Sequence, residues 1–157
     1  MPHIHHYQAT TQWTGNKGTG TSTYAAYNRS YDMSIAGKAT IQGSSDPAFR
    51  GDKSKHNPED LLVMTLSSCH MLWYLHLCAE HGVVVTDYVD EASGSMAENN
   101  DGSGQFTEVT LTPKVTVKET SMIEKANALH HQANQMCFIA RSVNFPVNHK
   151  PETIALS

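Results

Sequence analysis

One stretch decides the fold. Residues 57–82 read NPEDLLVMTLSSCHMLWYLHLCAEHG and contain the longest helix that the sequence predicts. The asparagine is a favourable N-cap, and the proline and acidic residues after it suit the first turn. Gly82 is typical of the residue that stops a helix, so we expect a helix from residue 58 to about residue 81. Apolar side chains occur on nearly every face of it, which predicts burial all round, in a large fold or at an oligomer interface.

The same stretch does not predict a membrane span. Polar residues interrupt it, so it falls short of the roughly 18 uninterrupted apolar residues that a span requires; they are Thr65, Ser67, Ser68, His70 and His76. The start of the chain, Met1-Pro2-His3, is not followed by a charged region and an apolar stretch, so no signal peptide is expected.

Composition limits the function classes. The chain has 157 residues, 39% hydrophobic and 17% charged, which predicts a single globular domain over residues 1–157. Its net charge of −4 is not the basic footprint of a nucleic-acid binder. Three cysteines, an odd number, indicate free thiols in a reducing compartment, so we expect a cytoplasmic protein.

The remaining elements predict an α+β fold. Short strands joined by glycine turns are expected over residues 5–43, with weak alternation at 7–10 and 33–36. After the helix, strands are expected at 83–89 and 106–117, with a turn at 99–104 between them. A capping box at Ser121–Glu124 predicts the start of a second helix, and a last strand is expected near 142–147. Strands, helix, hairpin, helix and strand in this order indicate α+β rather than parallel βαβ units.

The three cysteines carry the strongest chemical signal. Cys69 lies in the middle of the first helix, and Cys78 lies nine residues later, about half a turn round the helix. These two therefore face opposite ways and cannot be partners. From the residues alone, each is first interpreted as a small buried hydrophobic residue, and we keep that interpretation for Cys78. No two-plus-two spacing of Cys and His predicts a metal site, and no cofactor is expected.

Two motifs resemble a known family. Asn57-Pro58-Glu59-Asp60-Leu61-Leu62 followed by Ser67-Ser68-Cys69-His70 is similar to the first helix of the OsmC/Ohr family, the osmotically inducible and organic hydroperoxide resistance proteins. Residues 130–142, HHQANQMCFIARS, resemble the second cysteine segment of that family. The order of elements agrees as well, so the resemblance spans nearly the whole chain. It implies an OsmC-like fold, with antiparallel sheets packed around two central helices in an intertwined homodimer.

The resemblance also implies an activity and its residues. Family members reduce organic hydroperoxides with a cysteine pair, so Cys69 would be the attacking thiol and Cys137 the resolving thiol. Arg50 and Glu59 would form the activating ion pair, with Arg29 as the competing arginine, since Ohr-type members carry theirs nearer the N-terminus. The second segment has Phe138 and Ile139 in place of the common C-P-x-S-R pattern. A dithiol or lipoyl-type reductant would then reduce the disulfide between the two cysteines back to thiols.

Helix geometry adds a condition to this mechanism. Glu59 and Cys69 are ten residues apart on one helix, which separates their backbones by about 15 Å at 1.5 Å per residue. We therefore expect a composite site, with cysteines from one chain and Glu59, together with Arg50, from the other. Met71, Leu72 and Trp73 are candidates for an apolar pocket that favours organic hydroperoxides.

Other functions remain open at this point. The first alternative is a non-catalytic redox-sensing or small-molecule-binding protein on the same fold, because fold alone does not fix function. A second is a zinc-dependent hydrolase that uses Cys69, His70, His76 and His81. Whether His70 or His131 tunes the thiols is also open.

Overall fold

The computed structural model describes residues 1–157, and the chain forms two compact units, residues 1–61 and 62–157. We call them the N-terminal and C-terminal units. Nine strands in three small sheets and two α-helices confirm the α+β fold class. The expectation of a single domain stays a prediction.

The N-terminal unit is built on one antiparallel sheet. Its strands are β1 (Thr10–Trp13), β2 (Tyr31–Ser34) and β3 (Ile41–Gly43), in that order, and a short 3₁₀ turn, η1 (Pro47–Phe49), follows them. The predicted strands at 7–10 and 33–36 lie close to β1 and β2 but are displaced, and β3 was not predicted. The reason is that these strands are only three or four residues long, too short for alternation to set their ends.

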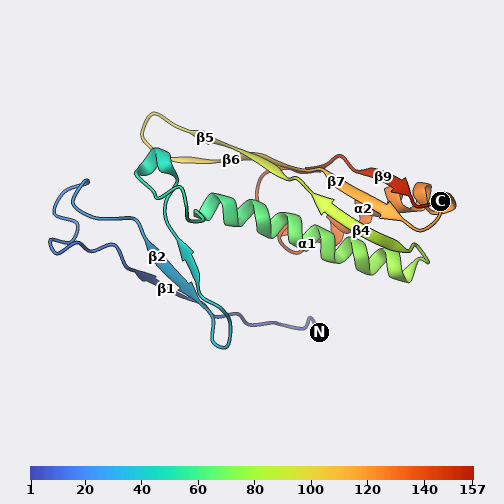
Figure 1. Cartoon of the computed structure of the whole chain (residues 1–157), viewed down its shortest axis with the longest axis horizontal. Coiled ribbons are helices and arrows are strands. Elements are labelled where there is room, and N and C mark those ends of the chain that lie inside the picture. The colour runs from blue at the N-terminus through green and yellow to red at the C-terminus, as the bar shows by residue number, and fades with distance from the viewer. The chain divides into compact units, whose positions relative to one another are not determined.

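The helix α1 (Pro58–Glu80) agrees with the predicted helix at both ends. Asn57 Oδ1 accepts a hydrogen bond from the backbone N–H of Asp60 at 2.8 Å, which is the expected N-cap, and Gly82 has a φ of 72°. Figure 1 shows α1 as one continuous helix. Its fully buried side chains lie on one face, whereas Leu72 is 63% and Met64 43% exposed. Burial all round is therefore not achieved within one chain.

By length and composition alone, α1 could cross a membrane, with a mean hydropathy of 1.4 over 18 residues. The central helix of a globular protein has the same pattern, and α1 carries polar groups that are bonded to the rest of its unit. Ser67 donates a hydrogen bond to Asp90, and His70 is bonded to His130. The expectation of no membrane contact stays a prediction.

The C-terminal unit also contains two mixed sheets. Their strands are β4 (Val85–Asp90), β5 (Ser93–Glu98), β6 (Gly104–Leu111), β7 (Pro113–Val117), β8 (Val147–His149) and β9 (Glu152–Ala155). One has the order β4-β7-β9 and the other β5-β6-β8, and in each the third strand pairs parallel with the second. The prediction of antiparallel sheets therefore holds for the other pairs only. Figure 1 shows β5 and β6 as a long hairpin.

The predicted hairpin is corrected in two ways. The turn at 99–104 exists, but it joins β6 to β5, a strand of small and polar residues that the sequence did not reveal. The single strand expected at 106–117 is divided at Thr112, and its second half, β7, pairs with β4 in the other sheet. Proline at position 113 lacks the N–H needed to continue one ladder, which explains the division.

The second helix, α2 (Ile123–Met136), follows a 3₁₀ turn, η2 (Thr120–Met122). The predicted capping box is wrong, because Ser121 lies inside this turn and no side chain caps either η2 or α2. The last-strand prediction is also wrong: residues 140–142 form another 3₁₀ turn, η3 (Ala140–Ser142), and the chain ends in β8 and β9.

Candidate active site

Two of the three cysteines meet where α1 and α2 come together. Cys69 is half-buried on α1, and Cys137, 1% exposed, is the C-cap residue of α2. Burial is the main reason that the pKa of the Cys137 thiol rises to about 11. The backbone N–H of Ala140 opposes this by donating to Sγ at 3.4 Å, and the neighbouring Cys69 thiol adds to it. The structure thus brings together the two cysteines that the sequence singled out.

Cys78 has no part in this arrangement. It is 1% exposed and belongs to the hydrophobic cluster that contains Tyr74 and Leu129. Burial raises the pKa of its thiol. The prediction that Cys78 is a core residue is therefore confirmed.

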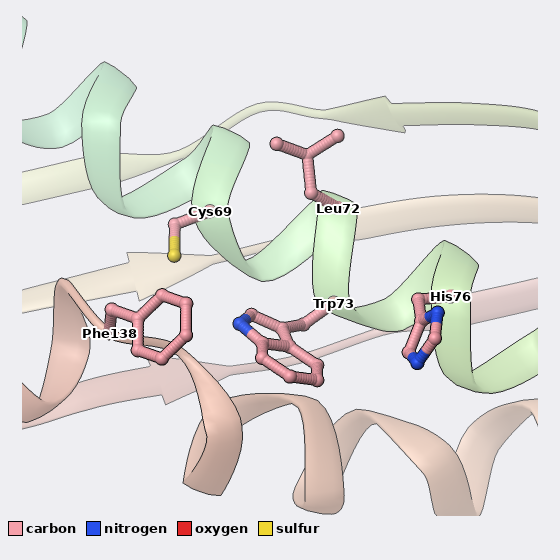
Figure 2. A pocket seen from close by; sticks show the side chains of 5 residues that line it. All are labelled: Cys69, Leu72, Trp73, His76 and Phe138. Atoms are coloured by element: carbon pink, nitrogen blue, oxygen red, sulfur yellow. The ribbon is translucent and has the colours of Figure 1, made fainter. Parts of the chain in front are cut away.

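An apolar hollow of about 310 Å³ opens beside Cys69. In Figure 2 the sulfur of Cys69 points toward the ring of Phe138, and the indole of Trp73 lies next to that ring. The two rings stand edge to face, with centroids 5.5 Å apart and planes at 72°. The lining residues are Cys69, Leu72, Trp73, His76 and Phe138.

The helix period explains why four of these residues share the hollow. Positions 69, 72, 73 and 76 follow the i, i+3, i+4, i+7 spacing that places side chains on one face of a helix. Leu72 and Trp73 therefore lie where the sequence suggested, whereas Met71 lines a different hollow together with Ser67 and Tyr88.

Glu59 and Arg29 share a second hollow, also of about 310 Å³, within the N-terminal unit. The Arg29 guanidinium donates to the carbonyl oxygens of Tyr27 and Tyr24 at 2.7 and 2.6 Å. It also lies over both of these rings, at 4.0 and 4.4 Å from their centroids. These contacts fix the guanidinium and leave other N–H donors of it free.

Arg50 is not among the residues that line this hollow. It follows η1 with a φ of 63°, and its guanidinium is 5.9 Å from the centroid of the Tyr24 ring. The ion pairs of the chain join His76 to Glu80 and Lys114 to Glu91, so neither arginine pairs with Glu59.

The histidines named in the sequence analysis have different surroundings. His70 is 1% exposed, and its Nε2 lies 3.0 Å from Nδ1 of His130 on α2, whereas His131 is exposed. No three or more His, Cys, Asp or Glu side chains converge as a metal site, and this includes the set of Cys69, His70, His76 and His81.

Comparisons with known proteins show the family and the fold of this chain. Residues 51–152 match the family model of OsmC-like proteins. The chain belongs to the OsmC family. An OsmC-like protein of unknown function from Vibrio cholerae is 30% identical, with a TM-score of 0.84 over 95% of this chain and 100% of that one. No curated protein matches.

More distant structures share the OsmC fold. An organic hydroperoxide resistance protein from Elizabethkingia anophelis has a TM-score of 0.71 at 16% identity, covering 99% of each chain. The organic hydroperoxide resistance protein OhrB of Bacillus subtilis has a TM-score of 0.59 at 20% identity, over 94% of this chain and 98% of its own.

Two residues of this OsmC-like chain were not singled out for a site by sequence reasoning. Phe138 stood out only as a departure from the family pattern, yet it forms a wall of the hollow beside Cys69. Tyr31 lines the hollow that holds Arg29 and Glu59. Its one sequence signal would have been a tyrosine on β2 opposite a glycine on β3, which cannot be recognised before the strand register is known.

Proposed function

We propose that this OsmC-like protein is a thiol-dependent peroxidase that reduces organic hydroperoxides to alcohols. The observation that carries the proposal is the neighbouring pair of free thiols, Cys69 and Cys137, beside an apolar hollow. Two similar structures are named organic hydroperoxide resistance proteins, which agrees with this chemistry.

The reaction needs two steps that balance. The Cys69 thiolate attacks the distal oxygen of the hydroperoxide, the O–O bond breaks, and the alkoxide takes up a proton and leaves as the alcohol. Cys69 is then a sulfenic acid. The Cys137 thiol attacks that sulfur, forming the disulfide and releasing water, and an external dithiol of the small-molecule or lipoyl type reduces the disulfide by exchange.

The apolar hollow supplies selectivity. Trp73 and Phe138 present aromatic surface next to the Cys69 sulfur, and Leu72 adds hydrocarbon surface to the same hollow. Such a wall binds the organic part of a hydroperoxide by burying apolar area and gains nothing from hydrogen peroxide. This favours organic hydroperoxides as the substrate class.

Activation of the Cys69 thiol requires a cation, because Cys69 is too far along α1 for the helix dipole to help. We place this cation in the hollow that Glu59 lines, and since Arg29 shares that hollow it is favoured over Arg50. Glu59 and Cys69 are ten residues apart on α1, so we expect these groups to come from a second copy of the chain. The exposed Leu72 and Phe138 are apolar surface that a homodimer would cover.

The first experiment is the consumption of tert-butyl hydroperoxide in the presence of excess dithiothreitol. The wild type should turn over, Cys69→Ser should be inactive, and Cys137→Ser should lose turnover or stop after a single event. A Cys69 that is alkylated rapidly in a protein without turnover would instead indicate the redox-sensing or binding alternative. An unreactive Cys69 would make it a core residue.

Sedimentation tests the composite site separately. We expect a homodimer at the concentrations of the assay. A stable monomer with full activity would refute the requirement for a second chain while leaving the cysteine chemistry intact.

A further inference from the structure

The hollow of the N-terminal unit contains two buried polar atoms without a partner. They are the hydroxyl oxygen of Tyr31 and Oε2 of Glu59, and neither makes a hydrogen bond in the chain. Most buried polar side-chain atoms in proteins are hydrogen-bonded, so two unpaired atoms on residues that line the same hollow need an explanation. A ligand with both a donor and an acceptor would satisfy both.

The position of the Tyr31 ring is set by the sheet. Tyr31 on β2 is paired in register with Gly43 on β3, and the ring lies over that glycine. A Cβ at position 43 would overlap Cε2 and Cζ of the ring and approach the hydroxyl oxygen to 2.7 Å. Gly43 has no positive φ, so it is the ring of Tyr31 and not the backbone that requires a glycine here.

The groups around the hollow have complementary roles. An ionised Glu59 only accepts hydrogen bonds, and Arg29 only donates them. Burial, and then the negative charge of Glu59, raise the pKa of Tyr31, so its hydroxyl keeps its proton at neutral pH and can donate. These three groups therefore offer one acceptor and two donors.

A hydroperoxide group fits this set. Its O–H can donate to Glu59, and its two oxygens can accept from Arg29 and Tyr31. Three other polar side chains of the hollow already have partners in the chain. Ser44 Oγ accepts from the backbone N–H of Asp52, Ser45 Oγ donates to the carbonyl of Phe49, and Asp46 Oδ1 accepts from the backbone N–H of Ala48.

We propose that Tyr31 is a further catalytic residue, whose hydroxyl donates a hydrogen bond to the alkoxy oxygen of the hydroperoxide. This rests on the proposed peroxidase function and on the Cys69 of a second copy as the nucleophile. When the S–O bond forms and the O–O bond breaks, the electron pair of the O–O bond moves to the alkoxy oxygen. Tyr31 stabilises that charge and stays a hydroxyl; the proton that completes the alcohol is the one that the Cys69 thiol released to solvent when it ionised.

The test uses Tyr31→Phe in the full chain, which removes the hydroxyl and keeps the ring over Gly43. We expect the rate constant for Cys69 oxidation by tert-butyl hydroperoxide to fall by about ten- to a hundredfold, the effect of losing one hydrogen bond to a charged group. With a peroxycarboxylic acid the fall should be smaller, because the leaving carboxylate needs less stabilisation. Alkylation of Cys69 by iodoacetamide should not change.

Two further variants sharpen the result. Tyr7→Phe, at a tyrosine that is 89% exposed and outside the hollow, should match the wild type in all three reactions. Gly43→Ala should reproduce the loss with tert-butyl hydroperoxide, since it displaces the ring but keeps the hydroxyl; if this variant does not fold, Tyr31→Phe alone decides.

The outcomes separate this inference from the proposed function. If the wild type turns over and Tyr31→Phe equals it within twofold, Tyr31 has no catalytic role. An equal loss with both peroxides, or a parallel loss in alkylation, would also overturn the role at the alkoxy oxygen. If the wild type consumes neither peroxide, the proposed function fails, and this inference fails with it.

Discussion

His70 on α1 and His130 on α2 are joined by a hydrogen bond of 3.0 Å between Nε2 of the first and Nδ1 of the second. The rings are nearly coplanar, at 3°, and His130 stacks on Tyr74 with centroids 3.9 Å apart. His70 and His130 are 1% and 0% exposed. This bond links the helix that carries Cys69 to the helix whose C-cap residue is Cys137, so it helps to set how the two thiols face each other.

Acid should weaken the fold through these two histidines. Burial lowers the pKa of His70 to about 4, with His149 contributing, and lowers that of His130 to about 3, with His70 and His149 contributing. In the unfolded chain both would titrate near 6.5. Between these values the unfolded chain binds protons that the folded chain does not, so the free energy of unfolding decreases as pH falls below about 6.5 and goes on decreasing toward pH 3. Urea midpoints at pH 7.5 and pH 5 measure this.

A double variant tests whether the histidine pair, and not other titrating groups, causes the pH dependence of stability. The double variant His70→Asn/His130→Asn should unfold more easily at pH 7.5, by about 1–3 kcal/mol for buried groups left without good partners, and should show a shallower pH dependence. His3→Gln, in the exposed N-terminal segment, is the control and should leave both unchanged. If the free energy of unfolding of the double variant depends on pH as steeply as that of the wild type, other groups cause the acid sensitivity.

Thiol labelling should follow burial. Cys78 and Cys137 are each 1% exposed, and burial raises the pKa of both thiols, whereas Cys69 is the most accessible of the three cysteines. Iodoacetamide at pH 8 should therefore modify Cys69 first, and the other two at least tenfold more slowly, because the thiolate is the reacting form. Peptide mass spectrometry over a time course gives the order; Cys137 labelled before Cys69 would contradict the assigned roles.

The two arginines can be separated by conservative substitution. Lysine keeps the charge but loses the planar fork of donors. Arg29 lines the hollow with Glu59 and Arg50 does not, so Arg29→Lys should lower the rate constant for Cys69 oxidation by about ten- to a hundredfold, the effect of losing one hydrogen bond to a charged group. Arg50→Lys should stay within about threefold of wild type. A larger loss of rate in Arg50→Lys than in Arg29→Lys would favour Arg50, the arginine indicated by the motif spacing.

The sequence predicted the parts of the fold that depend on local signals. The cap at Asn57, the stop at Gly82 and the turn before β6 are each determined by a few adjacent residues, and the structure has them all. The strands that no predicted range matches are β3, β5, β8 and β9. Small and polar residues such as those of β5 become a strand only because the long β6 pairs with them, a contact that no local pattern contains.

The residues of the candidate site also fall into two groups, those that local sequence signals predicted and those that depend on tertiary packing. Cys69 and Cys137 were found from motifs, and the helix period accounts for Leu72 and Trp73. Phe138 and Tyr31 could not be found, because each reaches its hollow from a segment whose direction is set by tertiary packing. The choice between Arg29 and Arg50 likewise depends on which side chain turns toward Glu59, which spacing along the chain does not determine.

Phe138 should act as the selectivity wall of the hollow beside Cys69. It is 67% exposed, so Phe138→Ala should fold with little loss of stability, while the hollow loses the ring that packs against Trp73. We expect kcat/KM for cumene hydroperoxide to fall by about tenfold, the effect of losing about 1.4 kcal/mol of apolar contact. For tert-butyl hydroperoxide, which is smaller, the fall should be less than threefold. Met136→Ala is the control, at an exposed apolar residue of α2 that does not line the hollow; equal losses for both hydroperoxides in Phe138→Ala would show that the ring acts on the thiol and not on the organic group.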